Sequence, residues 1–125
     1  MRWRARGEYE WAREVIRDLE VPEQTSLDDV IALVSRRIGQ PVTVVPIDAT
    51  VLNVALEEGP DRSLWIRVPT ETSAFHHRHL VCRGLVRALY REAGAGHGQI
   101  DYTHAIEREM EHAATLLTAR LSRGD

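Results

Sequence analysis

Hydrophobic residues recur at helical spacing in two N-terminal segments of the chain. In residues 9–19 the apolar side chains fall on one helical face, and Pro22 ends this segment because proline and the residue before it resist helical geometry. The second segment begins at Thr25 and Ser26, either of which can cap a helix, and it stops at Gly39. The pattern therefore predicts helices over residues 9–19 and 26–38.

Three short segments in the middle of the chain have the composition of β-strands. Residues 41–47 are rich in β-branched side chains and bounded by prolines, which favour the edge of a sheet. Residues 63–68 predict a second strand, and residues 51–56 a weaker third, with a turn over residues 57–61. Because short turns favour antiparallel pairing, the sequence predicts a small, mainly antiparallel sheet of about three strands.

Helical periodicity returns after the strands. Over residues 73–93 one stripe is formed by Phe75, His79, Cys82, Val86 and Leu89. Glycines in residues 94–98 break the chain, and a final helix is predicted over residues 102–121. The order of two helices, a sheet and two further helices predicts an α+β fold. We expect one domain over residues 1–125, with residues 1–7 as a flexible N-terminus.

Composition narrows the class of protein. With 43% apolar and 28% charged residues, a chain of 125 residues can bury a core without the help of disulfides. Its single cysteine excludes a disulfide within the chain. No segment approaches the roughly 20 consecutive apolar residues that a membrane span needs. The net charge of -3 argues against a general nucleic-acid binder. We therefore expect a cytoplasmic protein that binds neither membranes nor nucleic acid directly.

Two histidines and the cysteine are spaced as possible metal ligands. His76, His79 and Cys82 follow one another at intervals of three residues, which places them near one face of a helix. Imidazole and thiolate are both good zinc ligands, so a zinc site is one interpretation. The other is that the histidines are partly exposed and that the cysteine is a small buried side chain. His104 and His112, on the final helix, are predicted to be surface residues.

Residues 72–89 begin with the stretch Thr-Ser-Ala-Phe-His and continue as a predicted helix. This segment resembles the active-site helix of ImmA/IrrE-type proteins, which are small zincin-like metallopeptidase domains. In their actinobacterial branch a Thr-Ser-Pro-Leu-His stretch often precedes an HExxH motif. Residues 107–117 resemble the helix that carries the third zinc ligand, and residues 64–67 stand where the family has its edge strand. The resemblance covers residues 8–121 and implies a zincin-like minimal domain.

The residues needed for catalysis are mostly missing at the matching positions. The two zinc histidines of the family motif fall on Arg83 and Arg87, and the catalytic glutamate falls on Gly84. Only the position of the third ligand keeps a carboxylate, at Glu109. Arginine stays protonated and offers only donors, so it cannot coordinate a metal, and glycine cannot act as a base. The resemblance therefore implies an inactive peptidase that holds no cofactor.

An inactive domain of this family is expected to act by binding. Family members are often paired with helix-turn-helix repressors, so the resemblance implies a cytoplasmic regulatory protein whose partner is such a repressor or an antitoxin-like protein. The candidate residues for the cleft or the partner surface are Trp65, Arg67, His76, His79, Arg83, Arg87 and Glu109. Two alternatives stay open. One is an active zinc enzyme with a displaced site built from His76, His79, Cys82 and Glu109, and the other is a structural homo-oligomer that buries Trp3, Trp11 or Trp65.

The resemblance also leads to two structural expectations. Arg83 and Arg87 lie four residues apart on one helical face, and we expect one of them to bridge Glu109 in place of the metal. If Gly84 has no packing role, its replacement by alanine should leave stability unchanged or slightly raised, because glycine costs a helix about 1 kcal/mol relative to alanine.

Overall fold

The computed structural model describes residues 9–48, 55–93 and 104–122. Its elements are α1 (Glu10–Leu19), α2 (Leu27–Ile38), β1 (Val42–Ile47), β2 (Ala55–Glu58), β3 (Leu64–Pro69), α3 (Ala74–Ala93) and α4 (His104–Thr118). This order confirms the predicted α+β fold, with two helices, three strands and two further helices. The predicted flexible N-terminus, residues 1–7, and the predicted break at residues 94–98 lie outside the described residues.

The sheet is mixed, and the expectation of mainly antiparallel pairing was wrong for β1. The strand order is β1-β3-β2, with β1 parallel to β3 and β2 antiparallel to it. β2 and β3 are joined by a short turn and pair antiparallel as a hairpin, as expected. β1, however, pairs with β3 and not with β2, the strand that follows it in the chain. β1 is at an edge, as its prolines predicted, whereas residues 64–67 belong to the central strand and not to an edge.

The turn between β2 and β3 lies later than predicted. Glu57 and Glu58 belong to β2, and the chain reverses at Asp61 and Arg62, which both have positive φ angles, 57° and 63°. Two such residues in succession are typical of a type I′ hairpin turn. Ser63 N–H donates to the carbonyl of Pro60 at 3.1 Å and closes the turn. The hairpin fixes the register of β2 on β3.

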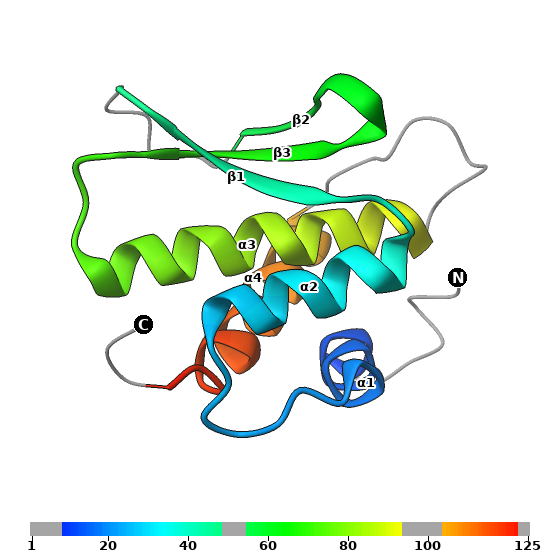
Figure 1. The fold of residues 1–125 in the computed structure, drawn as a ribbon. Helices are drawn as coiled ribbons and strands as arrows, with labels where there is room; N and C mark the ends of the chain where they lie inside the picture. The colour runs from blue at the N-terminus through cyan, green and yellow to red at the C-terminus, as the bar shows by residue number, and fades with distance from the viewer. Residues whose placement is uncertain (1–8, 49–54, 94–103, 123–125) are drawn as a thin grey trace.

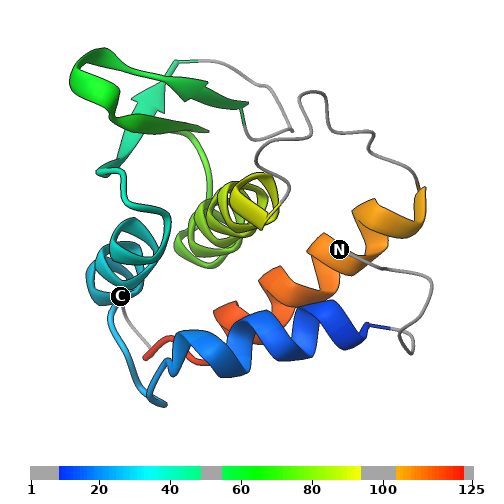
Figure 2. The same ribbon diagram turned by 90° about the vertical axis from the view of Figure 1, so that its right-hand side faces the viewer.

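The four α-helices of the described residues all lie on the same side of the sheet (Figure 1 and Figure 2). α3 runs beneath the strands and packs against β3 and β2, and α2 lies beside it. α4 packs against α3 from the side away from the sheet, and α1 packs against α4. α3 is therefore covered by the sheet above and by α4 below, which makes it the central element of the molecule.

The core is continuous from the sheet to α1. Its largest fully buried side chains are Leu64, Ile66, Leu80, Leu85, Leu117, Val30 and Val34. Phe75 departs from the predicted stripe, because its side chain is 66% exposed. Phe75 lies in the first turn of α3. The last residue of α4, Thr118, is next to His79, with 3.5 Å between its hydroxyl and the imidazole. The turn of α3 that precedes His79 therefore extends past the end of α4.

The chain after α4 turns back to the loop before α2. The final helix was predicted to reach residue 121 but ends at Thr118. Leu121 instead forms an isolated parallel bridge with Thr25, and Thr25 N–H donates to the carbonyl of Arg120 at 3.0 Å. None of the helices in the described part of the chain combines the length and apolar character needed to span a membrane.

Candidate functional site

Three basic side chains of α3 face two carboxylates of α4. His79, Arg83 and Arg87 follow at intervals of four residues and so lie along one helical face. The Nε atom of Arg83 is 3.4 Å from Oε1 of Glu111, and Nη2 of Arg87 donates to both carboxylate oxygens of Glu107 at 3.2 and 3.3 Å. Nε2 of His79 lies 2.7 Å from Oε2 of Glu111. We call these five residues the α3–α4 seam.

The α3–α4 seam is half-buried and its formal charges balance. The side chains of Arg83 and Arg87 are 28% and 24% exposed, and those of Glu111 and Glu107 are 45% and 39% exposed. Partly exposed ion pairs of this kind each contribute at most about 1 kcal/mol. Both carboxylates are engaged by guanidinium groups, which offer only donors. The seam therefore links two helices, and both of its carboxylates are paired with arginines.

Glu109 does not face the arginines, and the expected bridge to Arg83 or Arg87 was wrong. Its side chain is buried, and its Oε2 accepts a hydrogen bond of 2.9 Å from the backbone N–H of Ala12. Glu107 and Glu111 share one face of α4, but Glu109 is displaced by about 200° around the helix and points toward α1. Consequently the residue matched to the third zinc ligand has a different task, which is to hold the start of α1.

α1 receives this distant cap at a start where its own N-cap residue provides no side-chain acceptor. Its N-cap residue, Tyr9, has φ 60° and makes no side-chain capping bond. Unpaired N–H groups at the start of a helix must find acceptors elsewhere, and the helix dipole there favours a carboxylate. A second contact reinforces the first, since the ring of Tyr9 stacks on His112, with 4.4 Å between centroids. His112, predicted to be on the surface, is half-buried by this contact.

Gly84 faces the sheet, about 100° around α3 from Arg83 of the seam. A Cβ atom built on Gly84 would lie 2.6 Å from Cγ2 of Ile66 and 3.0 Å from its Cδ1. Ile66 is on the central strand and is fully buried, so it has little freedom to move aside. The glycine thus allows α3 to approach β3 closely. A neutral Gly84→Ala was expected only if Gly84 had no packing role, and this contact shows that it has one.

We expect Gly84→Ala to lower the free energy of unfolding by about 1–2 kcal/mol. Overpacking a full core costs about 1–3 kcal/mol, and the better helix propensity of alanine returns up to about 1 kcal/mol. Chemical denaturation measures the change. A double-mutant cycle with Ile66→Ala is the control, because removing the clashing atoms should make the Gly84 substitution neutral or favourable. A stabilised Gly84→Ala protein would contradict the close packing of α3 on β3.

The possible zinc ligands His76, His79 and Cys82 are not brought together. His76 is exposed, while the ring nitrogens of His79 face Glu111 and, at 3.5 Å, the hydroxyl of Thr118. Burial raises the pKa of the Cys82 thiol to about 11, although a hydrogen bond with Thr118 and the charge of Arg78 act in the opposite direction. Among the residues that the structure describes, no group of three or more His, Cys, Asp or Glu side chains could hold a metal ion.

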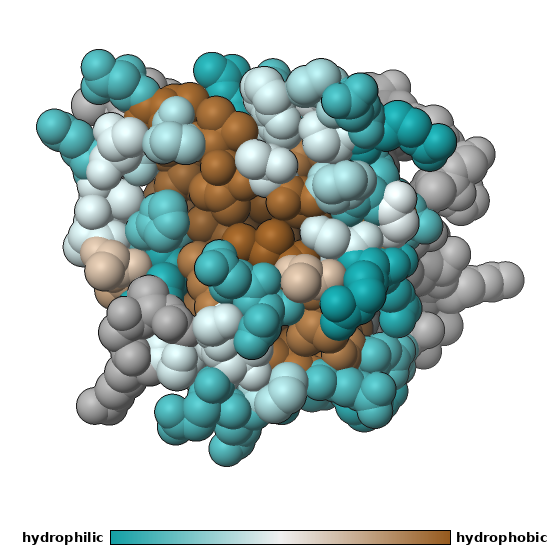
Figure 3. Space-filling model, viewed as in Figure 1, coloured by the Kyte–Doolittle hydropathy of each residue, from teal (hydrophilic) through white to brown (hydrophobic). Residues whose placement is uncertain are grey.

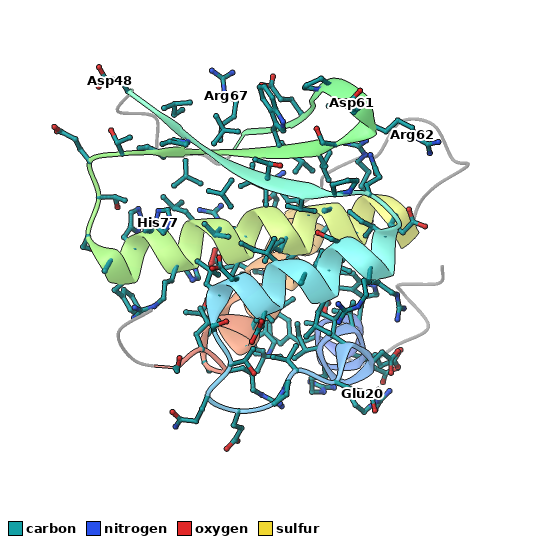
Figure 4. The ribbon with its side chains drawn as sticks, viewed as in Figure 1. Glu20, Asp48, Asp61, Arg62, Arg67 and His77 are labelled. Atoms are coloured by element: carbon teal, nitrogen blue, oxygen red, sulfur yellow. The ribbon has the colours of Figure 1, made fainter. Side chains whose placement is uncertain are left out.

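Trp65 and Arg67 lie on the far side of the sheet from these residues. Along β3, Leu64, Ile66 and Val68 point toward α3, so the alternate residues Trp65 and Arg67 point outward. Figure 4 shows Arg67 projecting away from the helices. The register places Thr43, Val45 and Glu57 beside them, and these five residues form what we call the open sheet face. None of the described helices covers it.

The candidate residues thus divide among separate places. His79, Arg83 and Arg87 meet in the seam, Glu109 faces α1, His76 is exposed on α3, and Trp65 and Arg67 lie on the open sheet face. The sequence analysis missed Glu107 and Glu111, the partners of the arginines. Their spacing of four residues matches that of Arg83 and Arg87, and this was the signal that could have identified them.

Comparison with known proteins adds no relative. No family model matches the chain, and no curated protein and no solved structure is significantly similar to it.

Proposed function

We propose that this protein is a catalytically inactive, ImmA/IrrE-like regulatory module that acts in the cytoplasm by binding a partner protein. A helix-turn-helix repressor or an antitoxin-like protein is the partner class that the resemblance suggests. The observation that carries the proposal is the α3–α4 seam. At the positions matched to the zinc histidines, Arg83 and Arg87 are paired with Glu111 and Glu107, and the position matched to the catalytic base is a glycine packed on Ile66.

The arrangement in the seam favours binding over hydrolysis. Hydrolysis by a zincin needs two imidazoles four residues apart on a helix and a carboxylate that activates the bound water. Here the same helical face presents two guanidinium groups, and no carboxylate replaces the base at Gly84. α3 and α4 pack closely against each other, and this supports the proposal of a scaffold that can present surfaces.

The open sheet face is the surface we assign to the partner. Tryptophan and arginine are the residue types that contribute most often to binding hot spots, and Trp65 and Arg67 stand two residues apart on the same face of β3. Arg67 is held by an ion pair with Glu57, with 3.6 Å between Nη1 and Oε1. An ordered arginine next to a half-exposed tryptophan can bind an apolar residue flanked by a carboxylate.

Titration calorimetry with candidate repressors and antitoxin-like proteins from the same genome tests the proposal. We expect binding that Trp65→Ala together with Arg67→Ala weakens at least tenfold, since hot-spot truncations cost more than about 1 kcal/mol each. Arg17→Ala on α1, far from the sheet, is the matched control and should leave affinity unchanged. Equal affinity of the double variant would show that the open sheet face is not the binding surface.

The same samples test the absence of catalysis. Elemental analysis should find no stoichiometric zinc in protein purified without a metal-affinity tag, and the bound partner should stay intact during long incubation with added zinc. One tightly held zinc per chain, or cleavage of the partner, would overturn the proposal in favour of an active enzyme with a displaced site.

A further inference from the structure

The outward face of α2 carries opposite charges at its two ends. Asp28, Ala32 and Arg36 follow at intervals of four residues, and all three are exposed. At 1.5 Å per residue, Asp28 and Arg36 are about 12 Å apart along the helix axis, with the small side chain of Ala32 midway between them. Asp29 adds a second exposed carboxylate to the N-terminal end.

Asp28 and Arg36 each lie at the end of α2 where the charge favours the helix dipole, but neither has an ion-pair partner among the residues that the structure describes. Ion pairs between described residues involve α1, the strands, α3 and α4, but neither Asp28 nor Arg36 takes part in any of them. Eight residues separate the two, which is too far for the helix to pair them with each other. The face therefore presents an unneutralised acidic end and an unneutralised basic end.

Such a face is complementary to itself. If a second copy approaches with its α2 antiparallel, a two-fold axis through Ala32 places Asp28 opposite Arg36 of the second copy and repeats the contact at the other end. The small Ala32 side chains allow the two helices to approach closely at the axis. We propose that α2 is the interface through which two copies of this chain form a symmetric dimer.

Apolar surface beside α2 supports the same contact. Leu27 and Ile31 of α2 and Val42 and Val44 of β1 are only partly buried against the core, and the N–H of Val42 donates to the Ser35 hydroxyl of α2 at 3.1 Å. Figure 3 shows hydrophobic surface extending over β1 and down to α3, with hydrophilic side chains along α2 below it. A helix of a second copy lying on α2 would cover part of this surface, so the charges set the orientation and the apolar residues supply buried area.

This dimer differs from the homo-oligomer considered in the sequence analysis, in which a tryptophan side chain is buried between copies. Trp11 is only 5% exposed and packs edge-on against Tyr90, with 5.5 Å between ring centroids, so it is already used inside the chain. Trp65 lies on the open sheet face, away from α2, and Trp3 lies outside the described residues. The α2 interface leaves the open sheet face free, and it does not depend on the proposed function.

Sedimentation equilibrium of two charge variants tests the dimer. The wild-type chain should sediment as a dimer at micromolar concentration. Arg36→Glu places a carboxylate opposite Asp28 of the second copy, and Asp28→Arg places a guanidinium group opposite Arg36. Each variant alone therefore brings like charges together in both contacts and should dissociate at least ten times more readily. Mixed in equal amounts, the two variants should associate with each other, because every contact in the mixed dimer again joins opposite charges.

Two controls separate loss of the interface from a change in net charge and from unfolding. Arg17→Glu on α1 changes the net charge by the same amount as Arg36→Glu and should leave the dimer intact. Circular dichroism melting shows whether each variant is folded, as expected for exposed positions. A monomeric wild type, variants that dimerise as the wild type does, or variants that fail to associate on mixing would each overturn the proposal.

Discussion

Replacing Glu109 with alanine is expected to lower the free energy of unfolding by about 2–4 kcal/mol. The substitution leaves the N–H of Ala12 without its acceptor inside the protein, and a buried unsatisfied donor costs about 1–3 kcal/mol. It also removes a negative charge from the positive end of the α1 dipole and empties a buried site. Chemical denaturation followed by circular dichroism measures the difference.

Two further variants separate the cap from a general effect of charge. Glu109→Gln keeps an oxygen that can accept from Ala12, so it should lose less than half as much stability as Glu109→Ala. Glu111→Ala removes a carboxylate from the same helix, but one that is half-exposed and ion-paired, and should cost about 1 kcal/mol or less. If Glu109→Ala proved no more harmful than Glu111→Ala, the assignment of Glu109 as the cap of α1 would fail.

Glu109 also shows where sequence reasoning about this chain stops. The existence of α1 was predictable from the spacing of its apolar residues, because those residues face the core that the helix must cover. Its cap was not predictable, since Tyr9 is a poor capping residue and the acceptor comes from a residue 97 positions later. Only the three-dimensional packing of α1 on α4 brings the two together.

In the sheet, the positions of the strands were predictable but their pairing was not. Strand composition located β1 and β3 to within one residue at either end, and the prolines around β1 correctly indicated an edge. The parallel pairing of β1 with β3 depends on which strand occupies the centre, and nothing local to either strand encodes that choice. The hairpin of β2 and β3 is local, but its turn residues, Asp61 and Arg62, lack the glycine that usually marks a type I′ turn.

In the candidate site, the helix was predictable and its facing partners were not. The helical periodicity of residues 73–93 placed Arg83, Gly84 and Arg87 on one helix, which the structure confirms in α3. Assigning Glu109 as the facing carboxylate assumed a rotation of α4 that the structure does not have. The close contact of Gly84 with Ile66 was also invisible, because a glycine in a helix looks the same in sequence whether or not another element packs on it.

Changing both seam arginines to histidine is expected to create a zinc site. The Nε atom of Arg83 lies 3.4 Å from Glu111, and an imidazole Nε2 reaches about as far from the backbone as that atom does. Zinc bonds of about 2.0–2.2 Å to nitrogen and oxygen can bridge this separation between position 83 and Glu111. Arg83→His with Arg87→His adds two imidazoles, four residues apart, to that of His79 on the helical face toward Glu107 and Glu111, which lose their guanidinium partners.

We expect this double variant to bind about one zinc ion per chain with micromolar or tighter affinity, measured by calorimetry and by the visible absorption of a cobalt-substituted sample. Adding Glu107→Gln and Glu111→Gln should weaken the binding at least tenfold, because it removes both carboxylate ligands and leaves only imidazoles. The double variant should still cleave nothing, since Gly84 supplies no base. Failure to bind zinc would show that the α3–α4 seam does not have the shape of a metal cleft, and would remove the main structural support for the resemblance to the metallopeptidase family.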